Sequence, residues 1–294
     1  MKIVSTGSYL PYDTLSNGWF IGKSDPEWIE SKLGIKERKQ AQITTADLGF
    51  YAAKKAVERA EIAPRFIDMI ICATSTPAFM NPSNAAIIQY HLGAINAVSY
   101  DINAVCSGFI YGLTIAEAFK DRCHNILVIG TDAFTKITDW DHRNSVFFGD
   151  GAGAVLVRSS PEKLIYKMGT DGIGKDAFKT KWGGTFEMDS KAVYQAGMKY
   201  LPKTIRQVLK KADLTIDDID YLLPHQASIT MLKALTKEIG IPMEKVLTNM
   251  GKYANTAAAS IPILLDENNF KPGDKLLLAA IGSGWTYGAI IIEW

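Results

Sequence analysis

Three side chains of this 294-residue chain have the chemistry and the placement that nucleophilic catalysis requires. Cys106 stands where an apolar segment, SYDINAV, gives way to a helical one, SGFIYGLTIAEAF. His225 follows the apolar run IDYLLP, at the predicted carboxyl end of a strand, where α/β proteins generally build their sites. Asn255 precedes the helical stretch TAAASIPILLDE. Together they offer one nucleophile and two hydrogen-bonding groups that can stabilise negative charge on an oxygen.

The helix start is what distinguishes Cys106 from the other two cysteines. Unpaired backbone N–H groups and the positive end of a helix dipole favour thiolate, so we expect the pKa of this thiol to be lowered. A cysteine in apolar surroundings is otherwise most often a core residue, which is our interpretation of Cys72 and Cys123. Taken singly, Asn255 is typical of a helix N-cap and His225 of a loop histidine, but the combination favours catalysis.

The elements that must position these residues alternate between short β-branched runs and longer amphipathic segments. This is the pattern of an α/β protein with buried, mostly parallel strands. Strands are predicted over 67–73, 97–102, 125–130 and 152–157. Helices are predicted over 45–60, 84–92, 107–119, 193–212, 228–239 and 256–267.

The order of these elements occurs twice. The segment AVERAEIAPRFIDMIIC, from Ala56, resembles VLKKADLTIDDIDYLLP, from Val208, and a helix, a strand and a further helix follow each copy. Cys106 and Asn255 hold equivalent places before that last helix. We therefore predict two pseudo-symmetric βα halves, residues 1–160 with the cysteine and residues 161–294 with the histidine and asparagine, which bring both helix starts to one central point.

Composition narrows the class of protein. The net charge is +1, with 47% hydrophobic and 21% charged residues, which is typical of a globular protein and predicts no nucleic-acid or anionic-membrane partner. The uncharged stretch 276–292 contains Gly282, Gly284 and Gly288, so we expect two strands around a turn there instead of a membrane span. An odd number of cysteines, three, and an amino end without a signal-peptide pattern predict a reducing, cytoplasmic location.

Five segments in order along the chain carry a resemblance to a known family. DINAVCSGFIYGL, FFGDGAGAVL, LLPHQAS, YANTAAASIP and IGSGWTYG resemble the signature segments of the thiolase superfamily, and of its β-ketoacyl-acyl-carrier-protein synthase III (KAS III) branch in particular. The resemblance spans essentially the whole chain. It implies the thiolase-like fold, a five-layered αβαβα sandwich, a homodimer, no bound cofactor or metal, and an acyltransferase of fatty acid biosynthesis.

The resemblance also implies a division of roles. Cys106 would take an acyl group from a thioester, and His225 and Asn255 would hold the carbonyl of a malonyl thioester as carbon dioxide leaves. This fits the chemistry, because the enolate that develops needs fixed donors in a dry site, and a neutral imidazole N–H and an amide provide two. A second oxyanion hole is predicted from the backbone N–H groups of Cys106 and Ser283, in a turn whose glycines permit close approach. The segment GDGAG, 149–153, is assigned to packing beneath the site.

Substrate contacts follow from the same resemblance. Trp28 in DPEW matches a residue that stacks on the adenine of coenzyme A, Arg143 matches a second contact, and a coenzyme A thioester is therefore the expected acyl donor. Lys36 stands where an arginine is usual and cannot make the bidentate phosphate contact of arginine. Phe79 and Met80 resemble the part that lines or caps the acyl pocket, in this chain or across the dimer, and their bulk indicates a short or medium primer.

An acyl-carrier protein is the expected macromolecular partner. Because carrier proteins are acidic, basic helix faces near the tunnel mouth are candidates for docking, although ordinary solvated faces have the same composition. These residues are Lys203, Arg206, Lys210, Lys211, Lys233 and Lys237. Thr230 stands where an arginine that helps to dock the carrier is expected, which weakens this assignment.

Alternatives to this function make different demands on the sequence. Within the family, the departures leave open a condensing enzyme of a secondary-metabolite pathway that uses a carrier-bound or unusual acyl donor. A thiolase would need a second cysteine near the carboxyl end, where IGSGW offers Ser283, and a hydroxymethylglutaryl-type synthase would need an acid near the nucleophile's partner. A papain-like hydrolase would carry a CGSCW-like string. A catalytically inactive subunit that dimerises with an active paralogue is disfavoured, because all three catalytic positions hold the residues that catalysis requires.

Overall fold

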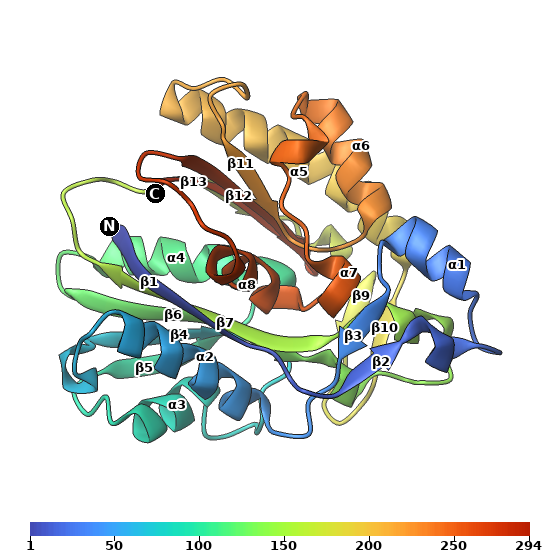
Figure 1. Cartoon of the computed structure of the whole chain (residues 1–294), viewed down its shortest axis with the longest axis horizontal. Coiled ribbons are helices and arrows are strands. Elements are labelled where there is room, and N and C mark those ends of the chain that lie inside the picture. Colours follow the sequence, from blue (N-terminus) through green and yellow to red (C-terminus); the bar gives the residue numbers. More distant parts are fainter.

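A computed structural model describes all residues from 1 to 294 and stacks two β-sheets between three layers of helices (Figure 1). The first sheet contains, in spatial order, β1 (Lys2–Tyr9), β7 (Asp150–Arg158), β6 (Asn125–Ala133), β4 (Met69–Ala73) and β5 (Val98–Ile102). The second contains β11 (Tyr221–Pro224), β12 (Lys275–Gly282), β13 (Thr286–Glu293) and β8 (Ile165–Thr170). The five-layered αβαβα sandwich is thus confirmed.

The two sheets repeat one pairing scheme. In the first, β4 pairs in parallel with β5 and β6, whereas β7 is antiparallel to β6 and β1. In the second, β11 and β12 are parallel, and β13 is antiparallel to β12 and β8. The counterpart of β5 in the second sheet is reduced to a single bridge between Leu222 and Val246.

The helices form an outer layer on each side and one central layer (Figure 1). The outer pairs are α2 (Thr45–Arg59) with α3 (Asn84–Leu92), and α5 (Ser190–Ala212) with α6 (Ile229–Ile239). The central pair, α4 (Gly108–Phe119) and α8 (Ser260–Glu267), is buried between the sheets and is predominantly apolar for that reason. None of the helices is both long enough and apolar enough to cross a bilayer.

Shorter elements lie near Cys106, His225 and Asn255. A hairpin of β2 (Thr14–Ser16) and β3 (Glu37–Lys39) encloses α1 (Pro26–Trp28), and a second hairpin is formed by β9 (Phe178–Thr180) and β10 (Phe186–Met188). Another short helix, α7 (Met250–Tyr253), precedes Asn255. The predicted strands and helices are all present, with ends displaced by a few residues. The largest displacement is in the predicted helix 256–267, which becomes α-helical at Ser260 after a 3-10 turn over Ala257–Ala259.

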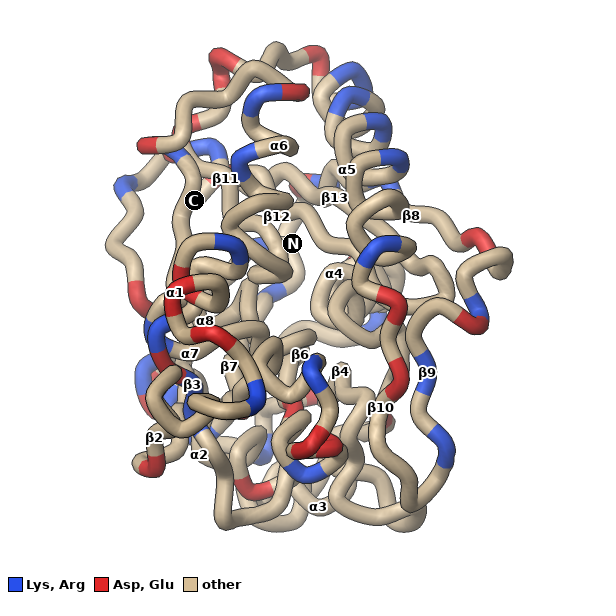
Figure 2. The backbone as a smooth tube through the Cα atoms, turned by 90° about the vertical axis from the view of Figure 1, so that its right-hand side faces the viewer, with Lys and Arg blue, Asp and Glu red and all other residues tan.

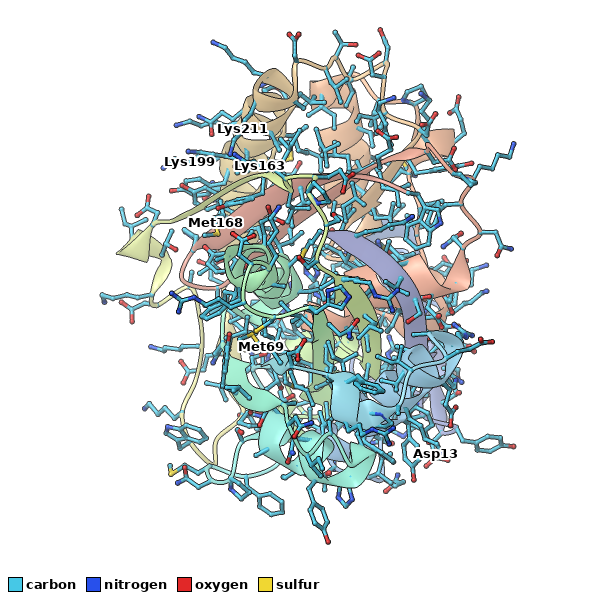
Figure 3. All side chains as sticks on the ribbon, turned by 90° about the vertical axis from the view of Figure 1, so that its left-hand side faces the viewer. Asp13, Met69, Lys163, Met168, Lys199 and Lys211 are labelled. Carbon is cyan, nitrogen blue, oxygen red and sulfur yellow. The ribbon has the colours of Figure 1, made fainter.

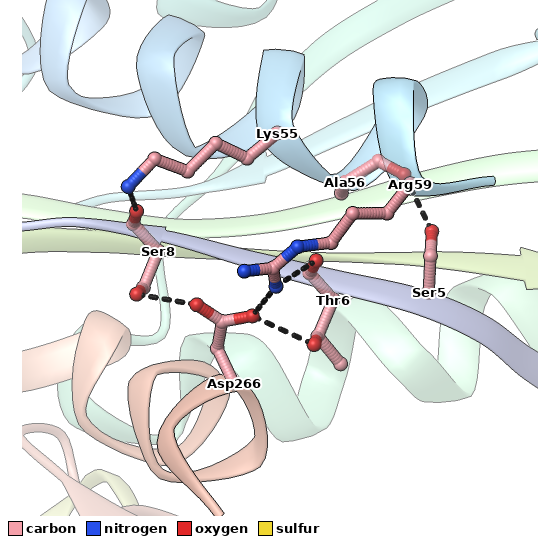
Figure 4. Close-up of polar contacts among 7 residues, drawn as sticks. All are labelled: Ser5, Thr6, Ser8, Lys55, Ala56, Arg59 and Asp266. Atoms are coloured by element: carbon pink, nitrogen blue, oxygen red, sulfur yellow. Dashed lines mark hydrogen bonds and ion pairs between the residues drawn. The ribbon is translucent and has the colours of Figure 1, made fainter. Parts of the chain in front are cut away.

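A polar cluster fastens the central layer to the first half of the chain (Figure 4). Asp266 of α8 accepts hydrogen bonds from the hydroxyls of Thr6 (2.8 Å) and Ser8 (2.6 Å) on β1, and it pairs with Arg59 of α2. The carboxylate is almost fully buried, so these partners replace the water that it loses on folding. One acid therefore joins α8, which continues the segment bearing Asn255, to the sheet that leads to Cys106.

Candidate active site

The two halves place Cys106, His225 and Asn255 around one cavity of about 340 Å³ whose lining is mainly apolar. Cys106 lies in the 3-10 turn Val105–Ser107, between β5 and α4, and its side chain is buried. Val105 has a left-handed φ of 47°, which is unusual for a β-branched residue and turns the chain sharply before the cysteine. Cys106 therefore lies at the helix start that the sequence predicts.

His225 continues β11 by one residue. Its backbone N–H donates to the carbonyl of Ala279 on β12 at 2.8 Å, so the strand end fixes where the imidazole enters the cavity. Burial lowers the pKa of His225 to about 4, and the imidazole is neutral near pH 7. Its Nδ1 atom lies 3.1 Å from the hydroxyl oxygen of Ser260, and its Nε2 atom lies 3.4 Å from Nδ2 of Asn255.

Asn255 is held by its own backbone and by its side-chain oxygen. Its N–H donates to the carbonyl of Phe147 and its carbonyl accepts from Gly149, both at 3.1 Å. Its Oδ1 accepts the N–H of Ala257 at 2.8 Å, which directs Nδ2 toward His225. The bond to Ala257 resembles that of a helix cap, so the ordinary and the functional interpretations both describe this residue.

Gly149 explains why the segment GDGAG lies beneath the site. A Cβ atom at this position would lie 2.3 Å from the carbonyl oxygen of Tyr253, so only glycine allows the start of β7 to approach the residues before Asn255. This is the packing role predicted for the segment.

A second glycine brings the turn after β12 against the backbone of Cys106. A Cβ atom at Gly282 would lie 2.5 Å from the carbonyl oxygen of Ala104 and 3.0 Å from the backbone nitrogen of Cys106. The hydroxyl of Ser283, the next residue, donates to the carbonyl of Phe178 at 2.5 Å and ties this turn to β9. The backbone of Ser283 is thereby held beside that of Cys106, and both residues line the cavity.

The direction expected for the Cys106 pKa is wrong. Burial raises the pKa of this thiol, and the charge of Asp132 raises it further, while the backbone N–H of Cys106 acts in the opposite sense. The helix start is present, but the loss of water around a thiolate outweighs it. The side chain of Cys106 is therefore a thiol near neutral pH.

Asp132, at the end of β6, connects the segments around the site. Its Oδ1 accepts from the N–H of Ser75 (2.8 Å) and the hydroxyl of Thr76 (2.9 Å), and its Oδ2 accepts from the N–H of Ala258 (3.1 Å). Burial raises the pKa of this carboxyl to about 6, although each of these hydrogen bonds opposes the change. Sequence reasoning did not select Asp132, because its partners are distant along the chain.

Gln226 is a second residue that sequence reasoning missed. Its amide donates to the carbonyls of Pro224 (2.8 Å) and Leu247 (3.3 Å), and its oxygen accepts from the N–H groups of Asn249 (3.1 Å) and Met250 (3.3 Å). It therefore links the residue after β11 to the start of α7, the helix that leads to Asn255. Its place beside His225 in the string PHQA was the available signal.

The predicted donor-binding residues divide into two groups. Trp28 and Arg143 line the cavity together with Lys32. Lys36 does not line it and lies in a shallow surface groove with Lys233, paired with Glu30 at 3.3 Å. The basic side chains that line the cavity are thus Arg143 and Lys32, and Lys32 stands four residues before the position that the sequence indicated.

Phe79 and Met80 do not line the cavity of Cys106 within this chain. They are 54% and 64% exposed and border a separate cavity of about 770 Å³, together with Trp182. The wall beside Cys106 is aromatic instead, with the rings of Phe134 and Phe148 stacked at 4.4 Å. Phe178 and Phe186, from the second hairpin, complete this aromatic wall. Within a single chain the segment TPAFMNPS, before α3, therefore borders this second cavity, and its predicted role across the dimer stays a prediction.

No group of three or more His, Cys, Asp or Glu side chains is placed to hold a metal ion.

Comparisons with known proteins agree along the whole chain. The family described as 3-oxoacyl-[acyl-carrier-protein (ACP)] synthase III matches residues 100–172, and that described as 3-oxoacyl-[acyl-carrier-protein (ACP)] synthase III C terminal matches residues 209–294. The beta-ketoacyl-[acyl-carrier-protein] synthase III of Clostridioides difficile is 41% identical over 320 residues, which cover 99% of this chain and 98% of the relative.

Solved structures give the same result. The 3-oxoacyl-[acyl-carrier-protein] synthase III from Aquifex aeolicus superimposes with a TM-score of 0.96 at 37% identity, covering 100% of this chain and 99% of its own. The corresponding protein from Pseudomonas aeruginosa gives a TM-score of 0.95 at 31% identity, with coverage of 100% and 98%.

Proposed function

Since the chain belongs to the β-ketoacyl-[acyl-carrier-protein] synthase III family of fatty acid biosynthesis, we propose that Cys106 carries the acyl group and that His225 and Asn255 stabilise the enolate. The enzyme is an acyltransferase that catalyses decarboxylative condensation, and a secondary-metabolite role is not favoured. The observation that supports our assignment is the convergence of one thiol and two hydrogen-bonding side chains on a single apolar cavity.

In the first half-reaction, the sulfur of Cys106 attacks the carbonyl carbon of an acyl thioester. The thiol proton passes to Nε2 of the neutral His225, and the oxyanion that forms is held by the backbone N–H groups of Cys106 and Ser283. The bond from the carbonyl carbon to the leaving sulfur then breaks, and the departing thiolate takes the proton from His225. The acyl group remains on Cys106.

In the second half-reaction, a malonyl thioester loses carbon dioxide. The electron pair of the broken C–C bond forms an enolate, whose oxygen accepts hydrogen bonds from His225 and from Nδ2 of Asn255. The enolate carbon attacks the acyl carbonyl, the bond to the Cys106 sulfur breaks, and the thiolate regains a proton from solvent. The product is a β-ketoacyl thioester.

Two variants separate these half-reactions. Cys106→Ala should abolish the acyl-enzyme detected by intact mass, yet release labelled carbon dioxide from malonyl-CoA. Asn255→Ala should still accept the acyl group but lose one enolate donor, at a cost of about 2.7 to 4 kcal/mol by analogy with a lost oxyanion-hole donor. Condensation at the wild-type rate by Asn255→Ala would show that this residue is a helix cap only.

A coenzyme A thioester is the proposed acyl donor. Trp28, Arg143 and Lys32 all line the cavity, which supports stacking on an adenine ring and charge pairing with phosphate. Trp28→Ala should raise KM for acetyl-CoA and leave decarboxylation of a malonyl-pantetheine, which lacks the adenine, unchanged. An equal effect on both substrates would contradict this role.

The aromatic wall supports a short acyl primer. Phe134, Phe148, Phe178 and Phe186 are all buried and pack against Cys106, so the space beside the sulfur is enclosed. Acetyl thioesters should therefore acylate Cys106 faster than octanoyl thioesters, and Phe186→Ala should narrow the difference. A wild-type preference for octanoyl groups would refute this assignment.

We also propose an acyl-carrier protein as partner, docked near the mouth of the cavity. Figure 2 shows basic residues along α5, but this helix begins with Ser190, which lines the cavity, and Lys211 lies roughly 30 Å further along at 1.5 Å per residue. Lys199 and Lys211 lie on the outer side of the molecule (Figure 3). Lys36 and Lys233, in the groove beside α1, are better placed to meet an acidic carrier.

Charge reversal tests this docking face. Lys233→Glu should raise KM for the malonyl carrier at low salt and leave KM for malonyl-CoA unchanged, because steering acts on the carrier's acidic surface. Lys211→Glu, far from the mouth on the same side of the sandwich, is the matched control. Equal effects of the two reversals would refute the proposed face.

A homodimer is proposed from the free edge of the first sheet. Strand β5 has one neighbour, β4, and its Val98 is 62% exposed. The exposed Phe79 and Met80 lie on the loop before α3, which packs against β5. Pairing of two β5 strands around a twofold axis would cover the edge and bring the two TPAFMNPS loops together.

Light scattering at micromolar concentration should give a molecular mass of twice 32.3 kDa, the mass of one chain. Val98→Lys should shift the protein toward monomer, because a charge would be buried at the edge. Val4→Lys, on the outer strand β1, is the control. A wild-type monomer would overturn the dimer. The cytoplasmic location stays a prediction.

A further inference from the structure

The hydroxyl of Ser260 lies between two acceptors in the buried layer behind His225. Ser260 is completely buried at the first position of α8. Its Oγ atom is 2.8 Å from the carbonyl oxygen of Ala257 and 3.1 Å from Nδ1 of His225. A hydroxyl has one proton, so it can donate to only one of these two atoms at a time.

The direction of this hydroxyl is coupled to the tautomer of His225. When Ser260 donates to Ala257, Nδ1 must carry the ring proton and donate to the serine oxygen, and Nε2 presents a lone pair to the cavity. When Ser260 donates to Nδ1, the ring proton lies on Nε2. Ser260 is the only hydrogen-bond donor that the structure places at Nδ1. The Ala257 backbone is also within hydrogen-bonding reach of the ring, where it favours ring protonation and therefore acts as an acceptor.

The two half-reactions require different faces of this ring. An Nε2 lone pair can accept the Cys106 proton, whereas an enolate oxygen needs an N–H on Nε2. A neutral ring with its proton on Nε2 leaves a lone pair on Nδ1. Without Ser260 that buried lone pair would have no donor, so the tautomer needs the hydroxyl at Nδ1.

We propose that Ser260 is a positioning residue that permits the Nε2–H tautomer of His225 when the malonyl thioester loses carbon dioxide. This inference rests on the proposed function. Ser260 touches no reacting atom and acts through the histidine. The same hydroxyl turns to Ala257 when the proton is on Nδ1, so one side chain satisfies either state of the ring.

Removal of the hydroxyl should therefore separate the half-reactions. In Ser260→Ala, Nδ1 loses its only donor while the Ala257 carbonyl remains within reach of the ring, so we expect the ring to retain its proton on Nδ1. Acylation of Cys106 by acetyl-CoA, followed by intact mass, should stay close to the wild-type rate. Decarboxylation of malonyl-CoA, followed as labelled carbon dioxide, should fall about a hundredfold, as for a lost oxyanion-hole donor.

Conservative variants distinguish loss of the hydroxyl from structural damage. Ser260→Thr restores a hydroxyl and should recover decarboxylation, and Ser260→Cys, of similar size but a weaker donor, should fall between wild type and Ser260→Ala. The cysteine variant also serves if Ser260→Ala does not fold. The matched control is Thr204→Val, which removes a buried helix hydroxyl that bonds to the Tyr200 carbonyl at 2.7 Å, away from the site. It should leave both rates unchanged.

Two results would overturn the role of Ser260. One is decarboxylation at the wild-type rate by Ser260→Ala, and the other is an equal loss of acylation and decarboxylation, which would indicate general damage. Failure of the proposed function is distinct, because in that case the wild-type enzyme itself would release no carbon dioxide from malonyl-CoA.

Discussion

Val105 and Ala254 occupy equivalent positions in the two halves, and both have left-handed backbones, with φ of 47° and 57°. Each stands one residue before a side chain of the site, Cys106 or Asn255. The duplication therefore preserves a sharp turn as well as the order of elements. Such conformations cost of order 1–3 kcal/mol in residues other than glycine, so the surrounding packing must maintain them.

Ala254→Gly tests this strain. Ala254 combines φ 57° with ψ −151°, a region that belongs almost entirely to glycine. Relief of strain should offset the loss of one buried methyl group, about 0.8 kcal/mol, so the unfolding midpoint in urea should not fall. Ala53→Gly, equally buried inside α2, is the control and should lose about 1 kcal/mol or more. Equal destabilisation by both changes would contradict the strain.

Asp132→Asn should make Cys106 more reactive. The carboxylate raises the pKa of the thiol, so its removal should lower that pKa and speed alkylation by iodoacetamide. Because the pKa of Asp132 is about 6, the gain should appear above that pH, where the wild-type carboxyl is charged. Asp150→Asn is the matched control, since Asp150 is equally buried, also has a pKa raised to about 6, and is not among the groups that shift Cys106. Equal rates of Cys106 alkylation in the two variants would contradict this effect of Asp132.

His225 should make folding sensitive to acid. The pKa of His225 in the folded protein is about 4, below the ordinary value of 6.5. Between these two pH values the imidazole is protonated in the unfolded chain but stays neutral in the native protein, so acidification favours unfolding. Its contribution is present above pH 6.5 and is lost as the pH falls toward 4. Relative to His225→Gln, wild type should lose on the order of 3 kcal/mol across that window. His91→Gln, at an exposed position, should show no such difference in urea unfolding; a His225→Gln curve parallel to wild type would contradict the prediction.

Gly282→Ala should impair both condensation and acylation. The added Cβ would push the turn away from the backbone of Cys106 and separate the two N–H groups assigned to the oxyanion. We expect kcat to fall by about 10²-fold or more, as for a lost oxyanion donor. Gly172→Ala, where an added Cβ meets no atom within 4 Å, should leave kcat unchanged. A normal acylation rate in Gly282→Ala would exclude the predicted oxyanion hole.

The sequence was sufficient to predict those features that depend on neighbouring residues. Periodicity located the strand before His225 and the helix start after Cys106, and the repeat predicted that Asn255 would meet them. The 3-10 turn before α8 was not predictable, because it depends on the bond from Ala257 to Asn255. The position of Phe79 and Met80 depends on tertiary structure and on the second subunit: within one chain they line a separate cavity, and their predicted role across the dimer stays a prediction.

The residues that were missed share long-range partners. Ser260 reaches His225 across 35 residues, and Asp132 reaches Ala258 across 126, so no window of sequence contains both members of either pair. The burial of Cys106 could not be predicted from the sequence for the same reason. The helix start at Cys106 is visible in the sequence, but the desolvation that raises its pKa arises only when both halves close around it.

The shared anchor at Asp132 has a thermodynamic consequence. One carboxylate binds Thr76, three residues before Phe79, and Ala258, three residues after Asn255. The free energies of substitutions at these two attachments cannot be independent, since loss of either partner leaves the other to hold the same buried charge. A double-mutant cycle between Thr76→Val, which removes the first attachment, and Ala258→Pro, which removes the N–H of the second, should therefore give a nonzero coupling energy, although the two residues do not bond to each other.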